Sequence, residues 1–262
     1  MVIFNKEIRK NTKSLSIWTA FIAGTMLICV MLYPEMRNQM AGLSDMFADM
    51  GAFTQAFGMD QLNFGTLIGY YGIECGNVLG LGGGLFAAYL GITVLSKEEK
   101  DHTAEFLLSH PVKRSSVVAQ KLAATICQIL ALNIIVFAVS AASIIAIGED
   151  IPMKELLLLH GGYLILQLEI ATICFGLSAF LRRGSIGIGL GGAALLYFMN
   201  IIVNLSEGAE FLKYVTPFVY AEPSTVMENM SLDMVLVGIG VLYSIIFVAI
   251  GFIHYGRKDI AA

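Results

Sequence analysis

The sequence predicts an all-α polytopic membrane protein with six transmembrane helices in a single domain of residues 1–262. Hydrophobic residues make up 57% of the chain and charged residues only 14%, and the mean hydropathy is +0.76. A soluble domain is normally about one quarter charged. Crossing a bilayer as a helix takes roughly 20 apolar residues. Six runs approach or exceed that length: 15–33, 66–95, 117–147, 156–181, 186–205 and 234–254.

Residues 1–14, before the first run, mix apolar and basic side chains. Phe4 and Ile8 lie among Lys6, Arg9 and other basic residues. This pattern predicts an amphipathic helix in the membrane interface that leads into the first span. A simple positively charged flank is the alternative.

Two segments between spans are predicted to be structured. In residues 34–65, apolar side chains recur at three- and four-residue steps, which predicts an amphipathic helix. It either rests on the outer leaflet or forms a lid over an exit path. Residues 206–233 hold two prolines and several aromatic residues, typical of a compact re-entry at the interface. The recurring side chains in the first segment are Met36, Met40, Leu43, Met46, Phe47, Met50, Phe53 and Phe57.

The distribution of basic residues predicts the orientation. With both termini in the cytoplasm, 13 of the 16 Lys and Arg residues are cytoplasmic, and only Arg37, Lys154 and Lys213 lie outside. Short cytoplasmic loops of membrane proteins carry an excess of Lys and Arg. We therefore expect an even number of spans and cytoplasmic termini.

Glycines recur at four-residue steps in two of the predicted spans. Gly76, Gly80 and Gly84 lie in the second span, and Gly187 and Gly191 in the fifth. Small residues at this spacing let helices approach closely in lipid. Close helix packing is the expected role, with sliding or dimer contacts as the alternative.

Two carboxylates fall inside predicted spans. Glu74 lies in the second span, one turn from Asn77, and Glu169 lies in the fourth, near Gln167. An acid at membrane depth is costly unless it is paired, protonated or wetted, so each is a functional candidate. These four residues either line a substrate path or serve a proton-linked step, or they form hydrogen bonds that fix the bundle.

The motifs of common enzyme classes are missing from the sequence. It contains no HExxH, no GxSxG and no GxxxxGK[ST] phosphate loop. We therefore expect no catalytic residue, no metal site and no cofactor bound by this chain. The basic residues are dispersed at helix ends, so nucleic acid is not an expected partner.

A charged segment, 96–121, separates the second and third apolar runs. It contains Glu98-Glu99, then Thr103-Ala104-Glu105-Phe106-Leu107-Leu108, then Ser109-His110-Pro111-Val112 and Lys113-Arg114. In this order of motifs the chain resembles the permease subunits of ABC type-2 exporters. The sequence departs from that family at Asp101-His102, where many members have a glycine.

The resemblance implies that residues 96–116 form a coupling loop whose helix docks on a separate ATP-binding subunit. Phe106, Leu107 and Leu108 would anchor it, inside a charged rim. The full contact set comprises Glu98, Glu99, Glu105, Phe106, Leu107, Leu108, Pro111, Lys113 and Arg114.

The same resemblance implies the composition of a larger complex. ATP and Mg²⁺ would bind two copies of the partner subunit, and a second permease chain would complete a homo- or heterodimer in a bacterial or archaeal cytoplasmic membrane. The expected cargo is hydrophobic or amphipathic, with peptides among the candidates. A proton-coupled secondary transporter that uses Glu74 and Glu169 is the alternative.

Overall fold

The computed structural model describes residues 2–40, 51–56, 62–63, 65–100, 112–181 and 185–258, which are helical or in connecting turns. Six helices in these ranges are long and apolar enough to cross a membrane. The α-helices are α1 (Val2–Met40), α3 (Ala52–Ala56), α4 (Leu67–Cys75), α5 (Gly83–Thr93), α6 (Lys97–Lys100), α8 (Arg114–Ala146), α9 (Met153–Ser178), α10 (Ile186–Leu205), α11 (Pro223–Asn229) and α12 (Met234–Arg257). The π-helix η1 (Gly76–Gly82) joins α4 to α5, and the 3₁₀ helices η2 (Glu207–Tyr214) and η3 (Val219–Ala221) follow α10.

Each of the six predicted spans coincides with one of these long apolar helices, with differences at the ends. The fifth span has the predicted bounds, whereas α8 begins at Arg114, so the last residues assigned to the coupling loop belong to the third span. The fourth span ends earlier, at Ser178. At the N-terminus, α1 runs unbroken from Val2, so residues 2–14 belong to the same helix as the first span.

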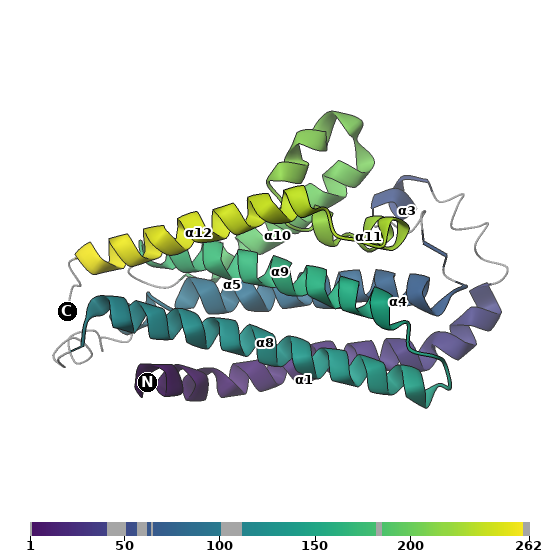
Figure 1. The fold of residues 1–262 in the computed structure, drawn as a ribbon, viewed down its shortest axis with the longest axis horizontal. Coiled ribbons are helices and arrows are strands. Elements are labelled where there is room, and N and C mark those ends of the chain that lie inside the picture. The colour runs from purple at the N-terminus through teal and green to yellow at the C-terminus, as the bar shows by residue number, and fades with distance from the viewer. Residues whose placement is uncertain are drawn as a thin grey trace.

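The helix α1 also continues beyond Tyr33, where the sequence predicted its end. Pro34 lies inside α1, which extends to Met40. A proline removes one backbone hydrogen bond, and spanning helices tolerate this with local adjustment. Figure 1 shows the C-terminal end of α1 bent away from the line of the helix, as expected near an internal proline. Half of the Met- and Phe-rich segment 34–65 lies outside the described residues; in the other half, residues 34–40 belong to α1 and Ala52–Ala56 forms the separate short helix α3.

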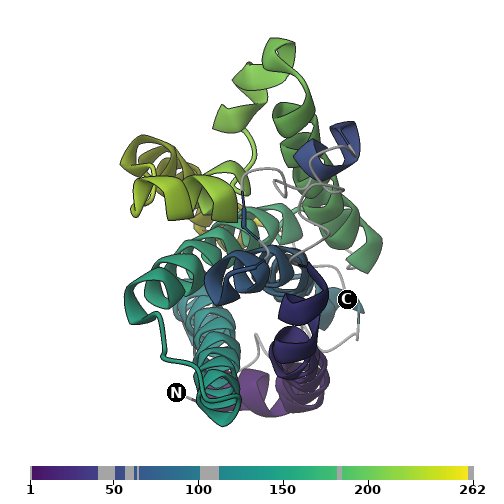
Figure 2. The same ribbon diagram turned by 90° about the vertical axis from the view of Figure 1, so that its right-hand side faces the viewer.

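The second and fourth spans form the centre of the bundle. In their most apolar stretches 61% of the residues are buried, compared with 17% in the fifth and sixth spans. The helix α5 packs on α9, while α1 packs along α8, α12 on α9 and α10 on α5. Figures 1 and 2 show α10 and α12 on the opposite side of this centre from α1. Large exposed apolar side chains on α10 and α12 are suited to contact with lipid or another membrane helix.

Glycines of the second span allow its close contact with α9. A Cβ atom at Gly80 would lie 2.8 Å from Tyr163, and one at Gly84 would lie 3.3 Å from Ile170. The packing role predicted for these glycines is thereby confirmed. A Cβ atom at Gly191 of α10 would meet nothing within 4 Å in the described part of the chain, so packing within this chain does not explain that glycine.

The segment between α10 and α12 is compact, as predicted. It comprises η2, η3 and α11, and it buries Phe218 and Tyr220 against the bundle. The Thr216 hydroxyl donates to the Leu196 carbonyl at 2.7 Å, which ties this segment to α10. In this segment η3 and α11 pack on α9, whereas η2 packs against α10.

We expect Gly91→Ala to destabilise the protein by about 1–3 kcal/mol, the usual range for overpacking. A Cβ atom at Gly91 would lie 2.3 Å from the backbone oxygen of Ala171, and backbone cannot yield as a flexible side chain can. Gly161→Ala, on α9, is the matched control because its Cβ would meet nothing within 4 Å among the residues that the structure describes. The measurement is the midpoint of thermal unfolding in detergent, and equal midpoints for the two variants would contradict the prediction.

Candidate functional site

Both termini and the two described ends of the predicted coupling loop lie at one end of the bundle (Figure 1). At the opposite end, Arg37 of α1 pairs with Glu149 after α8 at 3.1 Å. Arg37 was predicted to lie outside the cell, and Glu149 follows the third span on the side where that prediction places its end. The structure therefore separates the predicted outer residues from the predicted cytoplasmic ones.

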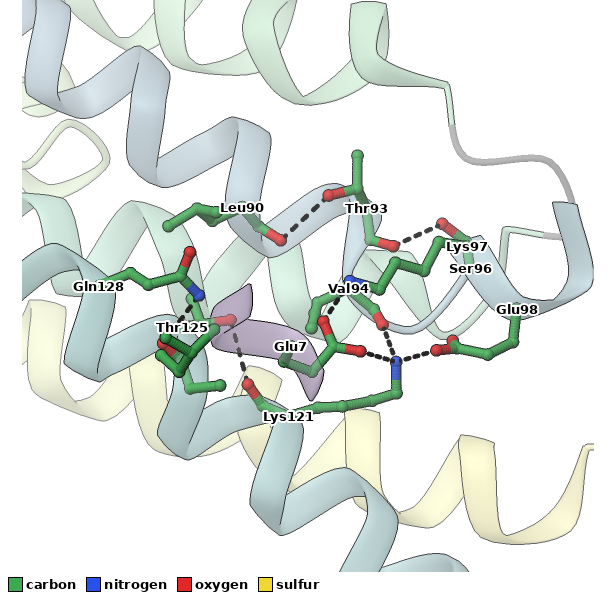
Figure 3. Close-up of polar contacts among 12 residues, drawn as sticks. Glu7, Leu90, Thr93, Val94, Ser96, Lys97, Glu98, Lys121, Thr125 and Gln128 are labelled. Atoms are coloured by element: carbon green, nitrogen blue, oxygen red, sulfur yellow. Dashed lines mark hydrogen bonds and ion pairs between the residues drawn. The ribbon is translucent and has the colours of Figure 1, made fainter. Parts of the chain in front are cut away.

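A buried ion-pair network lies where the coupling loop leaves the second span and enters the third. Its centre is Lys121 of α8, whose side chain is fully buried. The Lys121 Nζ atom donates to Glu98 Oε1 at 2.5 Å, to the Val94 carbonyl at 2.7 Å and to Glu7 Oε1 at 3.1 Å (Figure 3). A buried ammonium is tolerated when its donors are satisfied in this way. One lysine thus joins α1, α6 and α8.

Glu7 carries a second ion pair in the same network. Its Oε2 atom accepts from Lys97 Nζ, so each carboxylate oxygen of Glu7 faces one ammonium (Figure 3). Burial lowers the pKa of the Lys97 ammonium, and the neighbouring Glu7 carboxylate opposes this shift by favouring the charged form. Glu7, Lys97, Glu98 and Lys121 together place two carboxylates against two ammonium groups.

Contacts from the C-terminus reach the same loop. Lys258, just after α12, pairs with Glu99 Oε1 at 2.8 Å and donates to the Leu181 carbonyl at 3.1 Å. Arg114, at the start of α8, donates to the Lys258 carbonyl at 2.7 Å. The loop is therefore held at its start through Glu99 and at its end through Arg114. Both contacts involve residue 258, which follows the sixth span.

The sequence identified only part of this cluster. Glu98, Glu99 and Arg114 were predicted contact residues and lie in or beside the network, and Lys113 is exposed next to Arg114. Glu105, Phe106, Leu107, Leu108 and Pro111 lie outside the described residues. Glu7, Lys97, Lys121 and Lys258 were assigned no site role, because their partners are distant in sequence. One local signal was present: Lys121 follows Arg114 by seven residues and therefore lies on the same face of α8.

The intramembrane polar residues form two separate sets of contacts. Glu169 of α9 accepts a hydrogen bond from the Tyr220 hydroxyl at 2.9 Å. Gly240 of α12 makes room for this carboxylate, because a Cβ atom there would lie 2.1 Å from Glu169 Oε2. Gln167, two residues earlier, accepts from Asn133 Nδ2 at 2.6 Å and donates to the Leu79 carbonyl at 3.3 Å.

Glu74 and Asn77 lie at the junction of α4 with the π-helical segment. The Cys29 thiol donates to Glu74 Oε2 at 3.4 Å, and the Tyr197 hydroxyl donates to Asn77 Oδ1 at 3.1 Å. π-helical turns inside α-helices frequently occur at functional sites. Each of the four predicted polar residues therefore has a hydrogen bond to a different helix or re-entrant segment. This geometry accommodates both a path-lining role and a bundle-fixing role.

These observations define a class of protein: a helical multi-pass membrane protein with a charged, anchored loop base at the end that holds both termini. Residues 1–260 match the family model described as ABC-2 family transporter protein. The chain therefore belongs to the ABC-2 transporter family. Proteins of this family are membrane subunits that normally pair with an ATP-binding subunit. No curated protein matches the chain.

Proposed function

We propose that this chain is the transmembrane subunit of an ATP-driven exporter, powered by two copies of a separate ATP-binding subunit. Membership of the ABC-2 family is the observation that carries the proposal. Two permease chains would complete the transporter in a bacterial or archaeal cytoplasmic membrane. The excess of Lys and Arg at the end that holds the termini supports a cytoplasmic location for that end.

The buried ion-pair network supports a role for the loop in transmitting force. The loop begins at α6, which Lys121 and Glu7 connect to the third and first spans. Glu99 connects the same helix to Lys258 after the sixth span. A push on the loop from an ATP-binding subunit would therefore move several spans together instead of bending one connection.

The expected cargo is hydrophobic or amphipathic, with peptides among the candidates. Apolar side chains dominate the spans, and the buried Gln167 and Glu169 side chains of α9 are engaged in hydrogen bonds within the bundle. A path of this kind favours cargo with a large apolar surface over a highly hydrated polymer.

Co-purification with an ATP-binding subunit tests the proposal. The chain is co-expressed with the ATP-binding subunit from its own gene neighbourhood and purified in mild detergent through a tag on the permease. We expect a stable complex that hydrolyses ATP. An ATP-binding subunit from an unrelated transporter is the control. Purification of the permease without either subunit would contradict the proposal.

A further inference from the structure

A pocket opens beside the π-helical segment, in the half of the bundle that lies away from the termini. It has a volume of about 30 Å³, and it is bounded by η1, α9, α10 and the segment 218–223. A pocket of this size admits a head group of a few atoms, such as an ammonium group, while the rest of a larger ligand stays outside it. Its polar and aromatic lining comprises Asn77, Tyr163, Tyr197, Asn200, Phe218 and Glu222.

The polar lining offers an unsatisfied acceptor and a carboxylate. Asn200 is only 5% exposed, and its Nδ2 atom donates to Glu222 Oε2 at 2.8 Å. Because a carboxylate only accepts, the amide nitrogen must face Glu222, which fixes the amide orientation. The Asn200 Oδ1 atom is then buried without a hydrogen-bond partner among the described residues. Such an atom costs free energy unless a donor reaches it.

Two other donors at the pocket, the Asn77 amide group and the Tyr197 hydroxyl, already form hydrogen bonds within the protein. Asn77 Nδ2 donates to the Ile73 carbonyl at 3.1 Å, and the Tyr197 hydroxyl donates to Asn77 Oδ1. The pocket therefore presents the Asn200 amide oxygen and the Glu222 carboxylate to a ligand, beside the hydroxyl of Tyr163.

Aromatic rings form the walls around this acceptor. Tyr197 and Phe218 pack edge to face, with ring centroids 5.3 Å apart, and Tyr163 lines the pocket from α9. Aromatic faces attract cations, most strongly where water is excluded. A carboxylate, an unsatisfied amide oxygen and aromatic walls are together complementary to an ammonium group that still carries N–H donors.

We propose that this pocket binds the protonated amine of an amphipathic ligand, with Glu222 and Asn200 as its polar partners. The amine would belong either to the exported cargo or to an ethanolamine lipid headgroup. The inference deepens the proposed function by naming a ligand class. It rests on that function only for the transport of the bound ligand across the membrane. Binding itself needs neither ATP nor a partner subunit.

Fluorescence titration with dansylcadaverine, an amphipathic primary amine, tests the proposal on the purified chain in phosphatidylcholine nanodiscs. We expect the N-acetylated probe, which is neutral, to bind at least about tenfold more weakly. We expect a loss of similar size for the amine probe with Glu222→Gln. Glu228→Gln is the matched control, because Glu228 is an exposed carboxylate on α11 outside this pocket.

Equal affinity of the wild-type protein for the charged and neutral probes would overturn the proposal. That comparison needs no variant, so it holds even where Glu222→Gln fails to fold. Equal loss in Glu222→Gln and Glu228→Gln would also overturn it. Repeating the titration with phosphatidylethanolamine in the nanodiscs distinguishes the two sources: competition assigns the pocket to a lipid headgroup, and unchanged affinity assigns it to cargo. Failure of co-purification with an ATPase would leave these results intact.

Discussion

Replacing Lys121 with methionine is expected to destabilise the protein by about 3–5 kcal/mol, the range for removing one partner of a buried ion pair. Methionine keeps the length and apolar stem of the side chain but removes the ammonium group. Glu7 and Glu98 then lose the Lys121 cation, and the Val94 carbonyl loses its donor. In a thermal unfolding experiment in detergent, a loss of this size corresponds to a midpoint lower by about 10 °C.

Two further variants distinguish loss of the network from loss of any lysine. Lys113→Met removes a cation from an exposed position of the same loop end and should leave the midpoint within about 1 °C, because exposed charges contribute little. Adding Glu98→Gln to Lys121→Met should recover part of the stability, since one uncompensated carboxylate is removed. Identical unfolding midpoints for Lys121→Met and Lys113→Met would show that the buried ion-pair network does not stabilise the fold.

The spans were predictable from sequence because each is a continuous apolar run, and membrane helices satisfy their own backbone hydrogen bonds. The fifth span matched to the residue. The first span was predicted to end at Tyr33, where the apolar run ends, whereas α1 continues past Pro34 to Met40. The π-helical turn at Gly76–Gly82 had no clear sequence signal, because glycines at this spacing also occur in regular α-helices that pack closely on a neighbour.

The candidate site was less predictable than the spans, because its contacts join residues far apart in the chain. Glu7 lies among four basic residues and reads as one charge in an interfacial helix. Its partner Lys121 is 114 residues away, and the pairing depends on how α1 packs along α8. Glu222 and Asn200 were likewise assigned to separate segments, a loop and a span. Pattern in one sequence identifies a charged or polar residue, but the fold determines its partner.

Replacing Leu108 with aspartate is expected to lower transport at least tenfold or so, while the protein still inserts in the membrane. Leu108 lies outside the described residues, so this expectation rests on its place in the sequence between two anchored loop ends. Under the proposed function it is an apolar anchor in the groove of the ATP-binding subunit. Loss of a central apolar anchor typically costs about 2 kcal/mol or more in binding, and a buried charge adds to that cost.

The measurement compares ATP hydrolysis with transport in proteoliposomes that hold both subunits. In Leu108→Asp we expect hydrolysis to persist with little transport, because the ATPase subunits still close but no longer move the loop. Glu105→Lys should weaken the contact in the same direction by reversing a rim charge. Ser115→Asp is the control: it adds the same charge at an exposed position in the first turn of α8, where an acid is favoured. Transport at the wild-type rate in Leu108→Asp would exclude the loop as the coupling contact, because no interface accepts a carboxylate in place of its apolar anchor without loss.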